Sequence, residues 1–383
     1  MRSITLLGAT GSIGASTLDL IRRAQGEWKV VALTANCQAV ELAKLAREFN
    51  AEIAVVGDES CLPELREALA GSGIEAAGGA TALVEAARRE ADLTVAAIVG
   101  CAGLAPTMAA IERGGLVALA NKEALVAAGD VMTAAVARYG ATILPTDSEH
   151  NAIFQCLAGN AISDVRSITL TASGGPFRGW TAAQLEAATP AQAVQHPNWS
   201  MGAKISVDSA TMFNKGLELI EAAHLFPVGL DALRIVVHPQ SVIHSMVEYR
   251  DGSTLAQLGP SDMRVPIASC LAWPRRMETP MPPLDLAAIG ELSFQAPDEE
   301  LFPATKLARE AAEAGGAAPA VLSAANEVAV AAFLAGQTKF TDIAALVART
   351  LARPLPPAPS SLEDVLEVDR ETRTRVREQL EHA

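Results

Sequence analysis

Short apolar runs alternate with amphipathic stretches over the first 147 residues of the chain. Residues 40–49 and 63–69 carry apolar side chains at helical spacing, whereas the apolar runs are too short for buried helices. Strands that alternate with helices are typical of a parallel, doubly wound sheet. We therefore expect an α/β fold that begins with a Rossmann-like domain over residues 1–147. The expected strands cover residues 3–7, 28–34, 52–56, 93–99, 116–119 and 142–144.

The pattern changes after residue 147. Apolar runs at residues 166–171, 232–237, 241–249 and 254–258 follow one another, and we expect few helices between them. This succession predicts an α+β domain over residues 148–272 with a mixed or antiparallel sheet. Residues 273–303 are rich in proline and predict a linker. Residues 304–383 predict a C-terminal helical bundle, with helices over 304–313, 319–335, 341–350 and 361–380.

Charge and composition narrow the class of protein. The 383 residues carry a formal net charge of −14, which argues against binding to nucleic acid or to anionic membranes. The longest stretch without charge, residues 93–111, contains two glycines and a proline, so it favours strand, loop and helix over a membrane span. An N-terminal strand in place of a signal peptide predicts a cytoplasmic protein. The five cysteines form no CxxC pair, and we expect buried thiols in a reducing compartment.

A glycine-rich turn follows the first expected strand. Residues 8–14 read GATGSIG, in which Gly8 permits a tight turn, Gly11 lets a pyrophosphate approach the backbone, and Gly14 lets helix and strand pack closely. The phosphates would lie at the N-terminus of the following helix. The spacing predicts dinucleotide binding, and the alternative is a tight turn that binds no ligand.

The end of the second expected strand bears on which dinucleotide binds. NAD sites usually carry an acidic residue here that holds the ribose 2′-hydroxyl, but residues 33–38 contain none. Nothing in this segment repels a 2′-phosphate, and Asn36 and Gln38 can donate hydrogen bonds to one. We therefore favour NADP over NAD, although no Arg or Lys in the segment supports that choice. The alternative is an ordinary polar loop.

Asn121, Lys122 and Glu123 follow the fifth expected strand at the sheet edge where ligands bind in α/β folds. Lys122 can present a cation to a substrate oxygen. The alternative is that Asn121 caps a helix and Glu123 is an acid in its first turn.

Asp147 and Glu149 follow the sixth expected strand, with Ser148 between them. In an extended chain, residues two apart point the same way, so both carboxylates can converge on one point. Converging carboxylates need a cation between them, and Mg²⁺ or Mn²⁺ accepts such ligands. The alternative is that Asp147 or Ser148 caps a helix that begins near Glu149.

Residues 204–218 hold a second polar cluster. If residues 211–223 are helical, Asn214 and Glu218 lie one turn apart on the same face, with Lys215 beside them. Glu218 is then a candidate third metal ligand, and Ser209, Asn214 and Lys215 suit a phosphate. Gly216 weakens the helix, which indicates a close approach by another group. The alternative is a solvated helix face with a Lys–Glu pair.

Two loops have suitable chemistry for substrate binding. Residues 171–177 expose backbone N–H groups at two glycines, and Ser173 adds a hydroxyl, so this loop can form an anion site or a plain turn. Residues 196–202 carry a Trp and can close over a substrate. His238 and His244 are more typical of core or turn histidines than of catalysts.

Taken together, the order and spacing of these motifs resemble the 1-deoxy-D-xylulose 5-phosphate reductoisomerase family, from the N-terminus into the helical tail. The resemblance implies a homodimeric, cytoplasmic, NADPH-dependent enzyme that needs Mg²⁺, Mn²⁺ or Co²⁺. It would isomerise and reduce its phosphorylated substrate to 2-C-methyl-D-erythritol 4-phosphate in the non-mevalonate isoprenoid pathway. The α+β domain would then carry catalysis and dimerisation.

The resemblance also implies a role for each matching residue. Asp147, Glu149 and Glu218 would hold the metal, and together with Lys122 they form the catalytic set. Ser173, Ser209, Asn214 and Lys215 would hold the phosphate, while Lys122 and Ser148 would contact the carbon skeleton and His196 and Trp199 would form the lid. NADPH would contact Thr10, Gly11, Ser12, Ile13, Gly14, Asn121, Glu123 and Gly202, in addition to Asn36 and Gln38.

Many members of this family have a basic residue where this chain has Cys37, so a strict preference for NADPH over NADH is an open point. Two other functions stay open on the residues alone. Semialdehyde and homoserine dehydrogenases also join a nucleotide domain to an α+β domain but need no three-carboxylate metal site. A non-catalytic NADP-binding sensor would tolerate Glu218→Gln.

Overall fold

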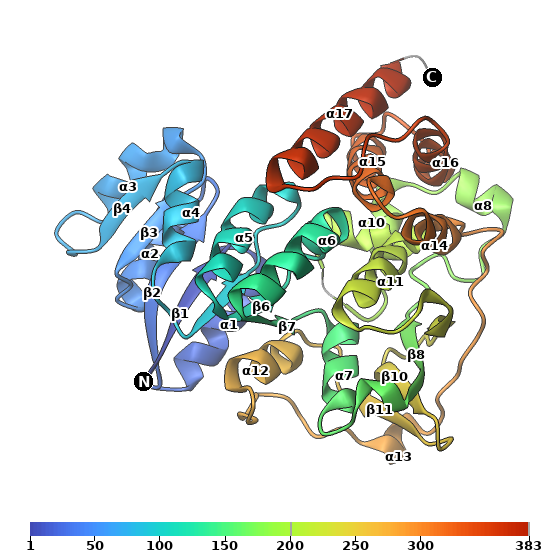
Figure 1. The fold of residues 1–383 in the computed structure, drawn as a ribbon, viewed down its shortest axis with the longest axis horizontal. Helices are drawn as coiled ribbons and strands as arrows, with labels where there is room; N and C mark the ends of the chain where they lie inside the picture. Colours follow the sequence, from blue (N-terminus) through green and yellow to red (C-terminus); the bar gives the residue numbers. More distant parts are fainter. Residues whose placement is uncertain (200, 382–383) are drawn as a thin grey trace. The chain divides into compact units, whose positions relative to one another are not determined.

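The structure is a computed structural model that describes residues 1–199 and 201–381. The chain folds into two compact units, both built from separate stretches of sequence (Figure 1). Unit 1 comprises residues 1–124, 132–151 and 263–280, and unit 2 comprises residues 125–131, 152–262 and 281–383. The domain boundaries expected at residues 147, 272 and 303 stay a prediction.

Unit 1 is built on a seven-stranded sheet in which every pair of neighbouring strands is parallel. This confirms the predicted α/β fold. The strand order is β4-β3-β2-β1-β5-β6-β7, so the chain reverses direction across the sheet between β1 and β5. Ligands of open α/β sheets bind at the carboxyl ends of the strands at such a point. The strands are β1 (Arg2–Leu7), β2 (Trp28–Ala35), β3 (Ile53–Val56), β4 (Glu75–Gly78), β5 (Leu93–Ala96), β6 (Gly115–Leu119) and β7 (Ala141–Pro145).

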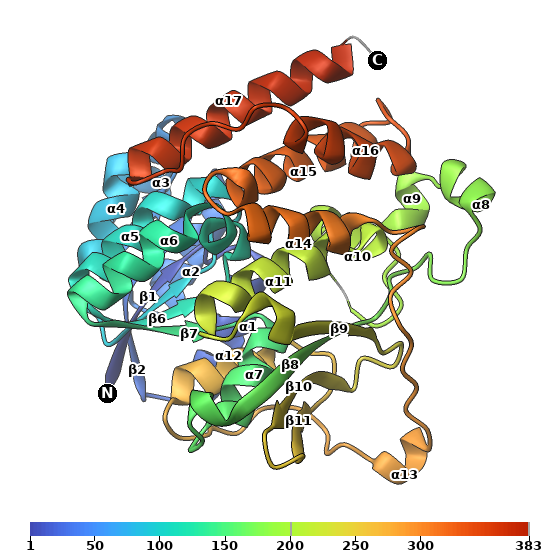
Figure 2. The same cartoon turned by 45° about the vertical axis from the view of Figure 1, so that its right-hand side comes forward.

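Helices cover both faces of this sheet. Right-handed crossovers place α1, α2 and α3 on one face and α4 and α5 on the other. In agreement, α4 packs against α5, while α1 packs against α12, which returns to unit 1 from much later in the chain (Figure 2). The helices are α1 (Ser12–Arg23), α2 (Ala39–Glu48), α3 (Leu62–Ala68), α4 (Ala80–Arg88), α5 (Leu104–Arg113) and α12 (Arg264–Ala272).

Strand β4 is the one strand of this sheet that the apolar pattern does not predict. Its sequence, Glu-Ala-Ala-Gly, has low strand propensity, and it lies at the edge of the sheet with no fully buried side chain. It pairs with β3 through the backbone, so its position is set by the neighbouring strand and not by its own side chains.

Unit 2 contains a four-stranded sheet with the order β11-β10-β8-β9. Strand β10 is antiparallel to both β8 and β11, whereas β9 runs parallel to β8, so the prediction of a mixed sheet is confirmed. One face packs on a core that includes Ile168, Leu219, Phe226 and Val247. The strands are β8 (Val165–Ala172), β9 (Leu233–Val237), β10 (Ile243–Tyr249) and β11 (Thr254–Leu258).

The expectation of few helices between these strands is wrong for the segment between β8 and β9. That segment contains α8 (Ala182–Glu186), α9 (Pro190–Ala193), α10 (Ala203–Thr211) and α11 (Phe213–Leu225). The two shortest helices begin at capping boxes, in which Thr181 and Thr189 each bond with a glutamine three residues later. The parallel pairing of β8 with β9 requires such a long crossover.

The C-terminal helices share one core with α10 and α11. Phe213 and Leu217 of α11 lie in the same buried cluster as Leu322 and Phe333. A Cβ at Gly216 would lie 2.8 Å from the Cβ of Ala308, so the close approach predicted at this glycine is made by a helix and not by a ligand. The predicted linker holds α13 (Leu286–Ile289), and the tail forms α14 (Ala304–Ala314), α15 (Ala318–Leu334), α16 (Phe340–Leu351) and α17 (Leu362–Glu381).

Two further helices, α6 (Lys122–Tyr139) and α7 (Ser148–Leu157), follow β6 and β7. Helix α6 is interrupted at Ala128, where φ is −120° and ψ is 22°. Within the described part of the chain, no helix is both long and apolar enough to cross a membrane.

Candidate functional site

The glycine-rich turn lies at the carboxyl end of β1, at the point where the strand order reverses. Gly8 has a φ of +92°, and a Cβ there would lie 2.7 Å from the carbonyl oxygen of Ala97, which follows β5. A Cβ at Gly14 would lie 2.4 Å from the carbonyl oxygens of Gly8 and Ala9. Gly11 and Ser12, at the N-terminus of α1, remain exposed. The turn therefore presents backbone N–H groups to solvent, as a phosphate site requires.

The segment after β2 is exposed at Asn36, Cys37 and Gln38. Its backbone is fixed to the loop after β3, because the amide of Asp58 donates to the carbonyl oxygen of Asn36 at 3.1 Å. The side chains of Asn36 and Gln38 can therefore meet a ligand from solvent.

Asn121 caps α6, as the structural alternative predicted. Its side-chain oxygen accepts from the amide of Ala124 at 3.1 Å, and its Nδ2 donates to the carbonyl oxygen of Gly100 at 2.9 Å. The amide thereby ties the loop after β6 to the loop after β5. Glu123 lies buried in the first turn of the helix.

Lys122 pairs with Asp147 across the carboxyl ends of β6 and β7. The distance from Lys122 Nζ to Asp147 Oδ2 is 2.6 Å, and the lysine side chain is only 6% exposed. Strands β6 and β7 are neighbours in the parallel sheet, so residues 25 positions apart in sequence meet at one edge. The ammonium of Lys122 and the carboxylate of Asp147 can therefore donate hydrogen bonds to a ligand and accept them from it at this buried position.

The geometry assumed for residues 147–149 is corrected. We expected an extended chain, but α7 begins at Ser148, so Glu149 already lies in the first turn of a helix. Ser148 Oγ donates to Glu149 Oε2 at 2.6 Å. The side chains of Asp147 and Glu149 are therefore not directed to one side by an extended backbone, and the prediction that a helix begins near Glu149 is confirmed.

Helix α11 brings Asn214, Lys215 and Glu218 together. Asn214 Nδ2 donates to Glu218 Oε1 at 2.5 Å, and the ammonium of Lys215 donates to Glu218 Oε2. The side chains of Lys215 and Glu218 are 3% and 1% exposed, which contradicts the alternative of a solvated helix face. The predicted helix over residues 211–223 is in fact two helices, separated by Met212 at a φ of +67°.

Ser209 lies in the last turn of α10, next to the glycine loop after β8. A Cβ at Gly175 would lie 2.7 Å from the carbonyl oxygen of Ser209, so the loop backbone packs directly on this turn. Asp208, which the sequence analysis gave no role, anchors the helix. Its carboxylate pairs with Lys204 at 2.7 Å and accepts from Asn326 of α15 at 2.7 Å. The partner Asn326 lies 118 residues away, so no local signal identifies this anchor.

His196 connects the predicted lid to the predicted anion loop. Its Nδ1 accepts from the amides of Asn198 and Trp199 at 3.2 and 3.0 Å, so its Nε2 carries the proton and donates to Ser173 Oγ at 2.8 Å. Ser173 Oγ also accepts from the amide of Gly175 at 3.1 Å. These bonds use the lone pairs of Ser173, and its hydroxyl hydrogen is left to donate to an anion.

The rest of the predicted lid packs near two histidines. Asn198 Nδ2 donates to the carbonyl oxygen of Pro239 at 2.6 Å, and the rings of Trp199 and His244 have centroids 6.0 Å apart. Gly202 is the residue that precedes α10. His238 is fully buried, and its two ring nitrogens lie at hydrogen-bond distance from the Ser293 carbonyl and the Val242 amide, which agrees with the predicted structural role.

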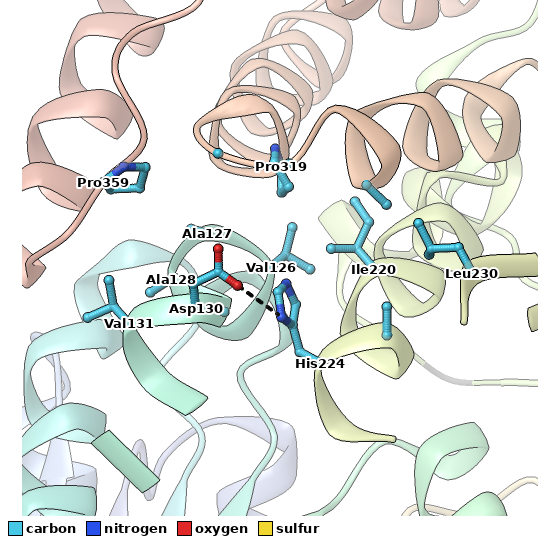
Figure 3. A pocket seen from close by; sticks show the side chains of 15 residues that line it. Val126, Ala127, Ala128, Asp130, Val131, Ile220, His224, Leu230, Pro319 and Pro359 are labelled. Atoms are coloured by element: carbon cyan, nitrogen blue, oxygen red, sulfur yellow. Dashed lines mark ion pairs between the residues drawn. The ribbon is translucent and has the colours of Figure 1, made fainter. Parts of the chain in front are cut away.

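A cavity of about 280 Å³ lies within unit 2 beside His224 (Figure 3). Burial lowers the pKa of His224, whose Nδ1 lies 3.9 Å from Oδ1 of the exposed Asp130. No described residue that lines this cavity is one of the predicted site residues. The cavity therefore adds nothing to the candidate site.

Two buried residues near the predicted metal ligands are not among the predicted site residues. His150 is fully buried in α7, and it offers a ring nitrogen within 4.8 Å of an Asp147 carboxylate oxygen. Glu221 is 1% exposed on α11, one turn beyond Glu218. The only available signal is their spacing from residues already singled out.

Comparison with known proteins gives the same family across the length of the chain. The 1-deoxy-D-xylulose 5-phosphate reductoisomerase family matches residues 4–129, and two models of its C-terminal domains match residues 143–226 and 258–375. The chain is 60% identical over 372 residues to a relative of this name from Zymomonas mobilis, covering 97% of this chain and 96% of the relative. A relative from Caulobacter vibrioides is 56% identical, covering 92% of this chain and 88% of the relative.

Solved structures agree. The reductoisomerase of Zymomonas mobilis in complex with NADPH is 57% identical, with a TM-score of 0.95 over all of both chains. A DOX-P reductoisomerase in complex with NADPH, fosmidomycin and magnesium is 43% identical, with a TM-score of 0.94 over all of this chain and 98% of the other.

Proposed function

Because the chain belongs to the 1-deoxy-D-xylulose 5-phosphate reductoisomerase family, we propose that the residue clusters described above carry that family's reaction. The chain is an NADPH- and metal-dependent oxidoreductase that converts 1-deoxy-D-xylulose 5-phosphate to 2-C-methyl-D-erythritol 4-phosphate in the non-mevalonate isoprenoid pathway. The observation that carries this conclusion is 60% identity over 97% of the chain. The homoserine-dehydrogenase alternative is not favoured.

We propose that the glycine-rich turn holds the pyrophosphate of NADPH. Gly8 and Gly14 have no room for a side chain, and the N-terminus of α1 is exposed beside them. Thr10, Gly11, Ser12 and Ile13 supply the backbone and hydroxyl groups of this turn. Asn36 and Gln38 contact the ribose end, and Asn121, Glu123 and Gly202 complete the cofactor contacts.

Asp147, Glu149 and Glu218 are our proposed ligands for the divalent metal. Their chemistry fits a hard cation, since carboxylate oxygens are its preferred ligands. Two of them, Asp147 and Glu218, are each paired with a lysine, so both carboxylates already lie beside a cation. When bound, the metal supplies Lewis acidity at the substrate oxygens and NADPH supplies the hydride.

Lys122 and Ser148 are proposed to orient the carbon skeleton of the substrate. An ammonium has three donor hydrogens, so Lys122 can pair with Asp147 and also donate to a substrate oxygen. Ser148 can donate its hydroxyl hydrogen to a substrate oxygen in place of Glu149. Holding the reacting carbons in one orientation lowers the entropic cost of reaching the transition state.

Ser173, Ser209, Asn214 and Lys215 are proposed to bind the substrate phosphate. Ser173 is oriented to donate its hydrogen, because its lone pairs are used by His196 and Gly175. Lys215 supplies a charge in a buried place, where it acts strongly on a phosphate. His196 couples this anion site to the loop that carries Trp199, so closure of the loop excludes water when phosphate is present.

Two further proposals concern assembly and location. We propose a homodimer, because β11 is an edge strand of the unit 2 sheet and its Leu255 is 44% exposed. We also propose that the enzyme acts in the cytoplasm, in keeping with its five free cysteines. Sedimentation velocity of the wild type and of Leu255→Glu tests the first proposal. A monomeric wild type would reject it.

The function is tested by following NADPH absorbance with 1-deoxy-D-xylulose 5-phosphate, first with Mg²⁺ and then with excess EDTA. We expect absorbance to fall only when substrate and metal are both present. A fall that survives EDTA would reject the proposed carboxylate site while leaving the reductase in place. No fall under any condition would reject the substrate.

A further inference from the structure

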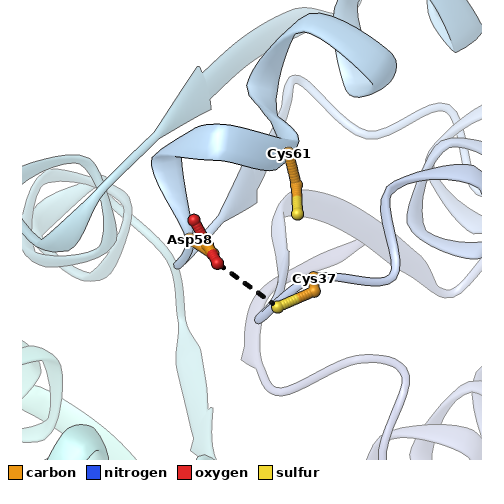
Figure 4. A group of neighbouring side chains, drawn as sticks. All are labelled: Cys37, Asp58 and Cys61. Atoms are coloured by element: carbon orange, nitrogen blue, oxygen red, sulfur yellow. Dashed lines mark hydrogen bonds between the residues drawn. The ribbon is translucent and has the colours of Figure 1, made fainter.

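Three side chains of unit 1 gather at the carboxyl ends of β2 and β3, beside Asn36 and Gln38, which we propose to contact the ribose end of NADPH (Figure 4). They are Cys37, Asp58 and Cys61. The expectation that every cysteine is buried is wrong here, because Cys37 is exposed and Cys61 is only partly covered, whereas Cys156 and Cys270 are buried. Two accessible thiols and a carboxylate therefore lie together, and both kinds of group are known as metal ligands.

The ligand atoms of the three residues already lie close together. Cys37 Sγ is 3.8 Å from Asp58 Oδ2, and the two sulfur atoms and one carboxylate oxygen all lie within 4.8 Å of one another. Ligand atoms bound at about 2.0–2.3 Å in a tetrahedral zinc site lie about 3.5–3.8 Å apart. Small rotations of the cysteine side chains are therefore sufficient to bring all three atoms to that spacing.

The backbone holds these residues in register. The amides of Gly57 and Asp58 donate to the carbonyl oxygens of Ala35 and Asn36 at 2.8 and 3.1 Å, which fixes the loop after β3 to the loop after β2. Residues 59–61 then form a single 3₁₀ turn that brings Cys61 back beside Asp58. Two neighbouring parallel strands thus place residues 24 positions apart in sequence in one cluster.

The Asp58 carboxylate is oriented by its own hydrogen bonds. Its Oδ1 accepts from the amide and the hydroxyl of Ser60 at 2.9 and 2.7 Å, and this leaves Oδ2 directed at Cys37. Outer partners of this kind fix the orientation of ligands in metal sites.

We propose that Cys37, Asp58 and Cys61 form a binding site for one thiophilic divalent cation, of which Zn²⁺ is the biological example. Two thiolates and a carboxylate satisfy three positions of a tetrahedral ion and leave the fourth to water or an anion. Mg²⁺ does not take thiolate ligands, so this site is distinct in chemistry from the carboxylate site proposed for catalysis.

Co²⁺ tests the site in the full-length, fully reduced protein, with Mg²⁺ in excess to occupy carboxylate sites. Thiolate ligation of Co²⁺ gives a charge-transfer absorption band that oxygen ligands do not give. We expect this band to saturate at one equivalent per chain and to disappear when Zn²⁺ is added. Cys37→Ser and Cys61→Ser should each abolish it, and Asp58→Asn should weaken Co²⁺ binding.

Cys101→Ser is the matched control, since Cys101 is also partly exposed in unit 1, and it should keep the band. Circular dichroism of each variant shows that the fold is retained. The proposal is overturned if the reduced wild type gives no band, if the band persists in Cys37→Ser and Cys61→Ser, or if Cys101→Ser removes it. It is also overturned if Cys37 and Cys61 are found to join in a disulfide while no band is formed by the reduced thiols.

Discussion

Two buried lysines in this chain each pair with a carboxylate, but they reach that pairing by different routes. Lys122 meets Asp147 at 2.6 Å because β6 and β7 are neighbours in the unit 1 sheet. Lys215 meets Glu218 because the two residues are three positions apart on α11 in unit 2. The first pair depends on the topology of a sheet, and the second depends on one turn of helix.

The difference matters for what each lysine is free to do chemically. Glu218 is held on both oxygens by neighbours in its own helix, Asn214 and Lys215, so this cluster is oriented by contacts within one helix. Asp147 precedes a helix, and Lys122 reaches it from the end of another strand. We infer that the α11 cluster serves as a fixed anchor and that Lys122 serves the reacting part of the substrate.

Glu218→Gln should have the largest effect. The substitution keeps the size of the side chain and its bond to Asn214, but removes the charge that we propose for metal binding. Lewis-acid polarisation is worth several kcal/mol, so we expect kcat/KM to fall about 10³-fold. The measurement is steady-state NADPH oxidation over a range of Mg²⁺ concentrations.

Glu310→Gln, on the exposed surface of α14, is the control for the loss of one acidic charge in unit 2 and should behave as the wild type. If Glu218→Gln retains wild-type kcat/KM at all Mg²⁺ concentrations, Glu218 is not a metal ligand. The proposal that α11 contributes to the catalytic metal site is then wrong.

The two lysines should separate in their kinetics. Lys215→Gln removes the charged hydrogen bond that we propose to the phosphate, worth about 1.5–3 kcal/mol, so we expect KM for the substrate to rise about 10- to 100-fold. Lys122→Gln should instead lower kcat by a similar factor, because we propose that Lys122 acts on the reacting end of the substrate. The pair of kinetic constants for each variant is the readout. If both variants change kcat and KM equally, the Lys122–Asp147 pair and the Lys215–Glu218 pair do not differ in function as we infer.

Ser173→Ala should have a smaller effect than either lysine variant. The substitution removes the neutral donor that we propose for the phosphate, worth about 1 kcal/mol, and we expect KM to rise about fivefold with little change in kcat. His196 acts through Ser173 in our proposal, so the double variant with His196→Gln should lose less than the product of the single effects. Independent, multiplying effects would show that the lid and the anion loop are not coupled.

His224 provides the smallest expected effect, at the other end of α11 from Lys215. Burial lowers its pKa in the folded chain, so the unfolded chain binds the proton first as pH falls through about 6.5. The free energy of unfolding should therefore decrease below that pH and be fully retained above it. Urea denaturation of the wild type and of His224→Gln at a series of pH values measures this. An identical pH dependence in both proteins would contradict it.

The sheet and the glycine turn could be predicted from sequence because sterics and periodicity are local. The apolar run of β1, followed by Gly8, Gly11 and Gly14, is compatible with few structures other than a strand, a tight turn and a helix. The same holds for Asn214, Lys215 and Glu218, whose spacing places them on one face of a helix. Strand β4 could not be predicted, because its alanines and glycine are positioned only by pairing with β3.

The other differences between the predicted and the observed structure depend on contacts with residues that are distant in sequence. The start of α7 at Ser148 overturned an argument from extended chain, because a Ser-Glu pair is compatible with either conformation. The break at Met212 places a non-glycine residue at positive φ, which only the packing of α10 and α11 against their surroundings can enforce. The buried hydrogen bond between Asp208 and Asn326 could not be predicted either, because the two residues are far apart in sequence.

The return of α12 to unit 1 has a consequence for biosynthesis. Unit 1 receives its last segment, residues 263–280, only after residues 152–262 have been made. Its sheet strands are complete by residue 145, yet 129 more residues, 152 to 280, must follow the second segment before the unit is whole. At about 5–20 residues per second, a ribosome needs roughly 6–26 s for that stretch. During this interval the surfaces of α1, β6 and β7 that α12 covers are exposed on the nascent chain, where chaperones can bind them.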